Sequence, residues 1–198
     1  MEENIVYQSF KIGMADRRKL NGHNSFLIFF TGLSGSGKST LANALEQKLY
    51  EENISSYVLD GDNVRMGINS NLTFKPEDRS ENLRRIGEIS KLFIDAGVVT
   101  LAAFIAPYEK DRELIKKTVG EENYIEIFVN TSLEVCEQRD VKGLYEKARK
   151  GEIKNMTGIS SPYEKPKSPD IEVSNQNSIE ESIEIIFNKI KNQIRLKP

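Results

Sequence analysis

The stretch GLSGSGKST, residues 32–40, decides the fold. Gly32, four intervening residues, and then Gly37, Lys38 and Ser39 reproduce the spacing of a P-loop, which grips the phosphates of a nucleoside triphosphate. Glycines, including Gly35, let the backbone aim successive N–H groups at phosphate oxygens with no Cβ in the way. Lys38 would add a cation for the β- and γ-phosphates, and Ser39 a hydroxyl ligand for the bridging Mg²⁺.

The flanking segments agree with this interpretation. FLIFF at 26–30 predicts a buried strand, and LANALEQKL at 41–49 predicts an amphipathic helix. A P-loop lies between such a strand and such a helix. The alternative, a flexible glycine-serine turn that matches by chance, is rejected because both flanks fit.

Further apolar segments at 56–59, 98–105, 124–129 and 170–173 alternate with helical patterns. They predict an α/β, single-domain P-loop nucleoside triphosphate hydrolase fold, with a five-stranded parallel sheet flanked by helices. One helix is expected at about 77–96, started by Pro76 and capped by Gly97. A last helix is expected at 178–194, where Ser178 and Glu181 form a capping box.

Residues 1–24 show no strong periodicity. They are interpreted as an N-terminal arm, with a partner contact or disorder as open alternatives. Residues 25–198 are then the P-loop domain.

Composition excludes several classes of function. Thirty acidic and 28 basic residues give a net charge of −2, so no global positive field for nucleic acid is expected. No apolar run is long enough to span a membrane. The single cysteine, Cys136, and the absence of a signal segment favour a cytoplasmic protein without disulfides.

The ligands of parallel sheets collect at the carboxyl ends of the strands, where two further motifs are expected. In DGDNVR, residues 60–65, Asp60 and Asp62 lie two apart on a glycine-containing turn that can bring carboxylates near a metal or an acceptor hydroxyl. Arg65 is a possible clamp for a phosphate or sulfate. A plain Asp-Gly turn is the alternative.

In FKPEDRSENLRRIG, residues 74–87, Arg79 and Asn82 share one face at the start of a helix, where the helix dipole favours an anion. They could bind a second, anionic ligand. A solvated helix start explains the spacing equally well.

The segment EQRDVKGLYEKARKGEIKNMTG, residues 137–158, is rich in basic residues and predicts a lid at about 138–160. Such a lid would bring positive charge to a transferring phosphoryl group and exclude water. A solvated basic helix is the alternative. The basic residues are Arg139, Lys142, Lys147, Arg149, Lys150 and Lys154.

Taken in order, GLSGSGKST, DGDNVR, FKPEDRSENLRRIG, FIAPY, DVKGLYEKARKGEIKNMTGI and YEKP resemble the adenylylsulfate kinase family over about residues 20–175. The resemblance implies ATP-dependent phosphorylation of adenosine 5′-phosphosulfate on its ribose 3′-hydroxyl. The products would be 3′-phosphoadenosine 5′-phosphosulfate, the activated sulfate donor of sulfate assimilation, and ADP. It also implies Mg²⁺ and a homodimer.

The resemblance implies roles for individual residues. Lys38 and Asp62 would be catalytic, with Asp62 orienting or deprotonating the 3′-hydroxyl, and Phe74 would cover the adenine of adenylylsulfate. ATP would contact Gly32, Gly35, Ser36, Gly37, Lys38, Ser39, Thr40 and Arg139, with Ser39 as the metal ligand. Adenylylsulfate would contact Asp60, Asp62, Asn63, Val64, Arg65, Phe74, Arg79, Ser80, Glu81, Asn82, Ile105, Ala106, Lys142, Asn155 and Met156.

The chain departs from the family pattern in two places. Ala106 stands where many relatives have a serine that has been considered as a phosphorylated intermediate, so an active enzyme must transfer the phosphoryl group directly. Asn155 and Met156 replace a frequent Gly-Phe pair, although a methionine can still cover an adenine face.

Two alternatives to this enzyme remain. One is a nucleotide-binding regulatory module that has lost catalysis, a hypothesis that only Ala106 favours. The other is a related P-loop kinase with another small acceptor, which should lack the DGDNVR and DRSENLRRIG motifs.

Overall fold

The computed structural model describes residues 4, 6 and 8–196 of the chain. Its centre is a sheet of five parallel strands in the order β2-β3-β1-β4-β5. All five predicted strands are confirmed. Their bounds are β1 Leu27–Thr31, β2 Ser56–Asp60, β3 Val99–Ala103, β4 Tyr124–Asn130 and β5 Ile171–Ser174.

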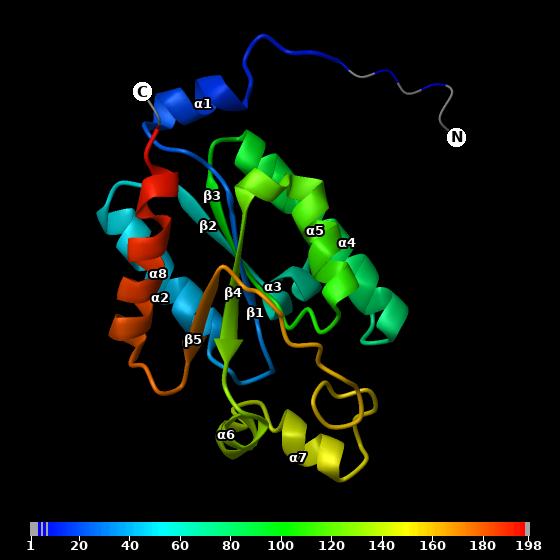
Figure 1. Ribbon diagram of the computed structural model, residues 1–198. Coiled ribbons are helices and arrows are strands. Elements are labelled where there is room, and N and C mark those ends of the chain that lie inside the picture. The colour runs from blue at the N-terminus through cyan, green and yellow to red at the C-terminus, as the bar shows by residue number, and fades with distance from the viewer. Residues whose placement is uncertain (1–3, 5, 7, 197–198) are drawn as a thin grey trace.

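Helices cover both faces of the sheet (Figure 1). On one face lie α2 (Lys38–Glu51) and α8 (Ile179–Ile194), and on the other lie α4 (Pro76–Asp95) and α5 (Glu109–Val119). The central strand β1 is buried throughout because alternate side chains point into these two layers. Ile28 and Phe30 join the cluster under α2 and α8, whereas Leu27 and Phe29 join the one under α4 and α5. Among the described residues, no helix is long and apolar enough to cross a membrane.

The ends of the long helices follow from local sequence. Pro76 occupies the first turn of α4, where its missing N–H costs nothing. Gly97 follows this helix with φ of +85°, a left-handed conformation that glycine adopts without strain. At α8, the Ser178 hydroxyl accepts from the Glu181 N–H at 3.1 Å, and the Glu181 carboxylate accepts from the Ser178 N–H at 2.8 Å. The predicted capping box is confirmed.

A short helix, α1 (Met14–Asn21), lies within the segment interpreted as an arm. It lies near the amino ends of the strands (Figure 1). Arg17 forms an ion pair with Asp95 at 2.8 Å, and the Asn21 side chain donates to the Gly97 carbonyl at 2.9 Å. Polar tertiary contacts therefore hold α1, together with Met14, which packs against the apolar cluster under α4 and α5. The assignment of residues 1–24 as an arm stays a prediction, and its residues 1–3, 5 and 7 lie outside the described part.

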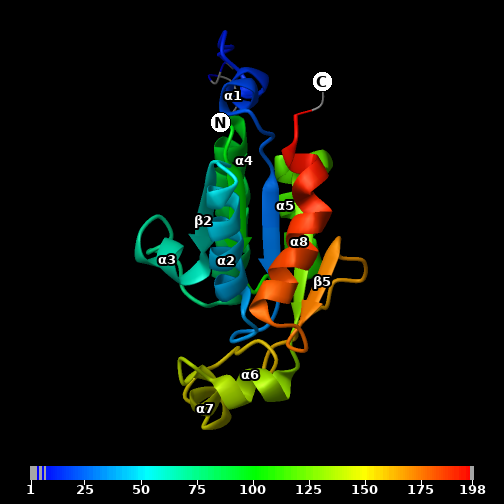
Figure 2. The same cartoon turned by 90° about the vertical axis from the view of Figure 1, so that its left-hand side faces the viewer.

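The loops at the carboxyl ends of the strands contain short helices. The DGDNVR segment is not a simple turn as expected: it begins α3 (Gly61–Met66), and the Asp60 carboxylate caps this helix by accepting from the Asp62 N–H at 2.9 Å. The predicted lid contains the end of α6 (Leu133–Arg139) and all of α7 (Leu144–Arg149). Figure 2 shows both beyond the carboxyl end of the sheet. A 3-10 turn, Glu121–Asn123, precedes β4.

We expect Ser178→Ala to lower the free energy of unfolding by about 1 kcal/mol, because the first turn of α8 loses its N-cap. Urea unfolding followed by circular dichroism measures this difference. The matched control is Ser168→Ala, which changes an exposed loop serine and should alter stability by less than about 0.5 kcal/mol. Equal stability of the two variants would contradict the capping role.

Candidate active site

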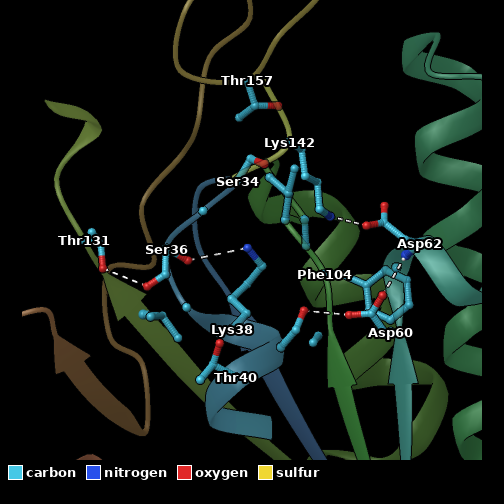
Figure 3. Close-up of a pocket in the computed structure, with 18 of the residues that line it drawn as sticks. Ser34, Ser36, Lys38, Thr40, Asp60, Asp62, Phe104, Thr131, Lys142 and Thr157 are labelled. Carbon is cyan, nitrogen blue, oxygen red and sulfur yellow. Dashed lines mark hydrogen bonds and ion pairs between the residues drawn. The ribbon is translucent and has the colours of Figure 1, made fainter. Parts of the chain in front are cut away.

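A cavity of about 920 Å³ lies at the carboxyl ends of the strands. The P-loop forms one of its walls, and α3 and the start of α4 form another. Residues of the predicted lid segment, 138–160, line it from beyond the sheet, and the β5–α8 connection adds a further part of the wall. Figure 3 shows the P-loop and the Asp60–Asp62 segment facing each other across this space.

The carbonyl groups of the P-loop already accept hydrogen bonds from within the protein. Thr131 Oγ1 donates to the Ser36 carbonyl at 2.9 Å, and Tyr145 Oη donates to the Ser34 carbonyl at 2.8 Å. Arg139 Nη1 donates to the Gly35 carbonyl at 3.1 Å. The N–H groups of the first turn of α2 have no carbonyl partner within the helix. The loop therefore presents backbone donors and the positive end of α2 to the cavity, which is how proteins bind phosphate.

Lys38 lies inside this loop and is 8 % exposed. Its Nζ donates to the Leu33 carbonyl at 2.7 Å. Burial lowers the pKa of Lys38 to about 8, because the ammonium form loses hydration that one carbonyl does not replace. A phosphate at this point would restore the preference for the charged form.

Ser39 and Asp60 bring two oxygen ligands together. The Ser39 hydroxyl donates to Asp60 Oδ2 at 2.6 Å, while Asp60 Oδ1 caps α3. A hydroxyl and a carboxylate side by side, next to a phosphate site, fit Mg²⁺, which prefers oxygen ligands and shares them with substrate phosphates. Ser39 would bind the ion directly, and Asp60 would orient Ser39 or a water of the ion.

Asp62 faces the lid across the cavity. Its carboxylate forms an ion pair with Lys142, and both side chains are about half exposed (Figure 3). The two residues are 80 positions apart in the sequence, so this pair joins α3 to the lid. It places an anionic group and a mobile cation together in the cavity wall.

Beyond Asp62, two arginines mark a second cationic region. The Arg65 guanidinium lies 4.6 Å from the centre of the Phe74 ring. Arg79 donates to the Phe74 carbonyl at 2.9 Å and to Thr157 Oγ1 at 2.9 Å, so it links the Phe74 loop to the lid. Burial and, second, the nearby Arg79 charge lower the pKa of Arg65. The carboxylates of Asp78 and Asp62 offset only part of this effect on Arg65, so two partly dehydrated cations make a site for an anion here.

Residues 105–107, shortly after β3, form the floor of the cavity. The main-chain carbonyls of all three residues accept hydrogen bonds. The Ile105 carbonyl accepts from Thr31 Oγ1 at 2.7 Å, and the Pro107 carbonyl accepts from the Glu164 N–H at 2.8 Å. The Ala106 carbonyl accepts from Arg112 at 2.8 Å.

Ala106 itself has φ of +43°, a strained conformation for a non-glycine residue. Arg112 is buried and pairs with Glu126 at 3.0 Å. A buried ion pair therefore supports the strained segment.

Most of the predicted site residues line the cavity. They are Gly35, Ser36, Gly37, Lys38, Ser39, Thr40, Asp60, Asp62, Arg65, Phe74, Arg79, Asn82, Ile105, Ala106, Arg139, Lys142 and Met156.

The other predicted residues lie outside the cavity wall. A Cβ at Gly32 would come within 2.7 Å of the Val129 carbonyl, so this glycine allows β4 to approach the P-loop rather than facing a ligand. The Asn63 N–H contributes to the cap of α3. Asn155 has left-handed φ, and its carbonyl accepts from Arg79 Nη2 at 2.6 Å. Val64, Ser80 and Glu81 also lie outside the wall.

The basic run of the lid divides into two parts. Arg139, Lys142 and Lys154 line the cavity. Arg149 and Lys150 instead form ion pairs with Glu137 and Glu146, and Lys147 is exposed. Half of the run is thus a solvated surface, as the alternative interpretation held.

Several lining residues were missed by the sequence prediction. Thr131 follows β4 directly, and Ser174 ends β5, so the rule that ligands gather at strand ends could have identified both. Phe104 and Thr157 carry no such signal, because each reaches the cavity through the path of its loop. The other missed positions include Ser34, Leu83, Ile153, Asn175, Asn177 and Ser178.

Comparison with known proteins adds three findings. A family model described as adenylylsulphate kinase matches residues 24–174. The adenylyl-sulfate kinase of Oceanobacillus iheyensis is 55 % identical over 191 residues, and the probable adenylyl-sulfate kinase of Bacillus subtilis is 53 % identical over 191 residues; each match covers 96 % of both chains. The solved structure of the Mycobacterium tuberculosis APS kinase in complex with AMPPNP and APS has a TM-score of 0.82 and 45 % identity. That match covers 85 % of this chain and 98 % of the other.

The pKa of Lys38 leads to a prediction for nucleotide binding. At pH 8 about half of the free protein carries a neutral Lys38, and bound phosphates favour the ammonium form, so binding of Mg·ATP should take up about half a proton per site. Affinity should therefore fall as the pH rises from 7 to 9. Titration calorimetry in buffers of different ionisation enthalpy measures the uptake. Lys38→Arg is the control, because a guanidinium stays charged; unchanged uptake in this variant would show that Lys38 is not the titrating group.

Proposed function

The chain belongs to the adenylylsulphate kinase family, and we propose that its cavity holds both substrates at once and transfers the phosphoryl group directly between them. The protein phosphorylates adenosine 5′-phosphosulfate with ATP, giving 3′-phosphoadenosine 5′-phosphosulfate and ADP. One observation carries the proposal of direct transfer: a single cavity contains two cationic groups, the P-loop with Lys38 and the Arg65–Arg79 pair, and the Asp62 carboxylate acts on both Lys38 and Arg65.

ATP occupies the P-loop end in this proposal. The backbone donors of residues 35–40 hold the β- and γ-phosphates. The Lys38 ammonium stabilises the negative charge that develops on the γ-phosphoryl group. Ser39 would hold a bound Mg²⁺, which would neutralise part of the phosphate charge. Arg139, which lines the cavity and already contacts the P-loop, contacts the adenine or the phosphates of ATP.

Adenosine 5′-phosphosulfate occupies the other end. Its phosphosulfate is an anion, so Arg65, Arg79 and Asn82 are its natural contacts there. The exposed ring of Phe74 and the buried side chain of Met156 cover the adenine. Ile105 and Ala106 form the floor, and Asp60 supports the neighbouring Asp62.

The transfer step follows from the position of Asp62. The ribose 3′-oxygen attacks the γ-phosphorus, the bond from that phosphorus to the β,γ-bridging oxygen breaks, and ADP leaves. The proton of the 3′-hydroxyl passes to the Asp62 carboxylate, which acts as general base. Lys142, now paired with Asp62, turns to the phosphoryl oxygens when the acceptor arrives.

Ala106 supports transfer without a phosphorylated enzyme intermediate at this position. Its side chain is a methyl group, and its carbonyl is already bonded to Arg112. A strained, buried segment of this kind is suited to positioning a substrate rather than to accepting a phosphoryl group.

The alternatives are weaker on the same grounds. A regulatory module without catalysis does not require Asp62 and Lys142 between two anion sites. A related P-loop kinase with another small acceptor does not require the Arg65–Phe74 and Arg79 contacts, which suit an aromatic, anionic acceptor.

We further propose that residues 138–160 act as a lid that opens for substrate exchange within a kinase domain of residues 25–198. Support comes from side-chain contacts between the lid and the rest of the cavity, such as Lys142 with Asp62 and Thr157 with Arg79. Side chains of this length can release such contacts without unfolding the domain. We also propose a cytoplasmic protein, since its one cysteine is a free thiol.

A homodimer is proposed from the family resemblance and from exposed apolar side chains. Tyr57, on the edge strand β2, stacks on Phe93 at 5.0 Å, and Leu92 beside it is 71 % exposed. We expect light scattering to give twice the monomer mass of 22.5 kDa. The 22.5 kDa mass over the whole working concentration range would contradict this proposal.

The direct test of function is release of ADP from Mg·ATP with adenosine 5′-phosphosulfate, AMP, gluconate or shikimate as acceptor. Mass analysis should find one added phosphoryl group on the ribose of adenosine 5′-phosphosulfate and turnover with that acceptor alone. Preference for another acceptor would favour the related kinase, and binding of both nucleotides without turnover would favour the module.

Arg79→Ala should separate the two ends of the cavity. We expect the Kd for adenosine 5′-phosphosulfate to rise about 10- to 100-fold, because one or two charge-assisted hydrogen bonds are lost. The Kd for ATP should stay within about threefold of the wild type. The matched control is Arg84→Ala, because Arg84 lies on the same helix but pairs with Glu81 on its surface. Equal losses for both nucleotides would remove Arg79 from the acceptor end.

A further inference from the structure

Asn82 contributes an amide group whose direction decides what it can bind. The residue is 4 % exposed and lines the acceptor end of the cavity. A carboxamide has an accepting oxygen on one side and a donating NH₂ on the other, so a rotation by half a turn exchanges the two. The neighbours of Asn82 determine which side faces the substrate. This inference rests on the function proposed above, in which Asn82 belongs to the acceptor end.

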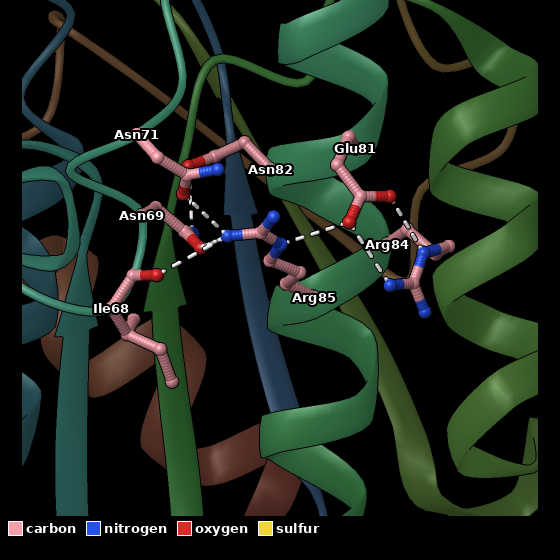
Figure 4. Close-up of polar contacts among 7 residues, drawn as sticks. All are labelled: Ile68, Asn69, Asn71, Glu81, Asn82, Arg84 and Arg85. Atoms are coloured by element: carbon pink, nitrogen blue, oxygen red, sulfur yellow. Dashed lines mark hydrogen bonds and ion pairs between the residues drawn. The ribbon is translucent and has the colours of Figure 1, made fainter.

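A series of hydrogen bonds runs from the surface of α4 to Asn82 (Figure 4). Glu81 accepts from Arg85 Nε at 2.8 Å. Arg85 Nη1 then reaches Asn69 Oδ1 at 3.4 Å, and Asn69 Nδ2 donates to Asn82 Oδ1 at 2.9 Å. Arg85 Nη1 also bonds the Ile68 carbonyl at 3.2 Å.

This series has one direction, because a guanidinium can only donate. The oxygen of Asn69 must therefore face Arg85, and its NH₂ must face Asn82. The oxygen of Asn82 accepts that bond, and the Nδ2 of Asn82 is left over. Among the described residues, the structure gives this Nδ2 no acceptor, and it is the side of the amide left for the cavity.

The burial of Asn69 and Asn82 fixes the orientation of both amide groups. Asn69 is completely buried, and its main chain is held by two bonds: its N–H donates to the Val64 carbonyl at 2.9 Å, and its carbonyl accepts from the Leu72 N–H at 3.0 Å. A flipped Asn82 would turn NH₂ toward NH₂ in this buried position, where an unpaired donor is costly.

We propose that Asn69, oriented by Arg85, is a positioning residue that fixes the NH₂ group of Asn82 toward the acceptor substrate. The chemistry of that substrate suits a donor: the phosphosulfate has only accepting oxygens, and the purine ring carries accepting nitrogens. An amide presenting its oxygen would repel both. Asn69 thereby sets affinity for the acceptor without touching it.

The decisive variant is Asn69→Asp. Its ionised carboxylate can keep the contact with Arg85, but it has no proton for the oxygen of Asn82. The Asn82 amide then rotates, donates its NH₂ to the introduced carboxylate and presents its oxygen to the substrate. We expect the Kd for adenosine 5′-phosphosulfate to rise about 100-fold, about the effect of two charge-assisted hydrogen bonds. The Kd for ATP should stay within about twofold of the wild type, which also shows that the variant is folded.

Two further variants isolate the route of the effect. Asn69→Ala should raise the same Kd by about tenfold in the wild type, but by less than about twofold when Asn82→Ala is already present, because Asn69 acts only through Asn82. Asn71→Ala is the matched control. It removes the other asparagine contact of Arg85, at 2.8 Å, and leaves the bond between Asn69 and Asn82 intact, so it should bind both nucleotides as the wild type does.

Binding is measured by calorimetry with each nucleotide alone, and turnover of the wild type with both. Wild-type affinity for adenosine 5′-phosphosulfate in Asn69→Asp would overturn the inference. The inference would also be overturned if Asn69→Ala raised this Kd by the same factor in the wild type and in the Asn82→Ala variant. If the wild-type chain itself neither binds nor phosphorylates adenosine 5′-phosphosulfate, the proposed function fails instead, which separates the two failures.

Discussion

The bonding of the P-loop carbonyls is the constraint on which the site depends. Because Thr131, Arg139 and Tyr145 donate to these carbonyls, the N–H groups of the loop stay available to receive phosphate. The same contacts tie the lid to the loop, so the positive charge of Arg139 and the nucleotide cradle share one geometry. Lys38, dehydrated inside this cradle, becomes sensitive to whether a phosphate is present.

The acceptor end depends on directional contacts of the same kind. Arg79 joins the Phe74 loop to the lid, Arg112 supports the strained Ala106, and Asn69 orients Asn82. Each of these contacts uses an amide or a guanidinium whose donors point in fixed directions. The two ends of the cavity are thus held by polar networks that place donors before any substrate binds, which is what phosphoryl transfer by positioning requires.

Most of the fold could be predicted from the sequence because its signals are local. The P-loop spacing, five apolar runs and the Ser178 capping box each act over a few residues. The helix α1 could not be predicted, since only Met14 packs on the core and distant residues, Asp95 and Gly97, supply its polar contacts. In the site, motif spacing found Asp62, Arg79 and Asn82, but the outward placement of Asn155 depends on its main-chain conformation.

Direct transfer between the two nucleotides is the central claim, and its stereochemistry tests it most directly. ATP made chiral at the γ-phosphorus with oxygen isotopes is used to phosphorylate adenosine 5′-phosphosulfate, and the configuration of the 3′-phosphoryl group is determined. A single in-line displacement at this site predicts inversion. Retention would mean two displacements through a phosphorylated enzyme, and it would contradict the account in which Asp62 activates the acceptor for direct attack.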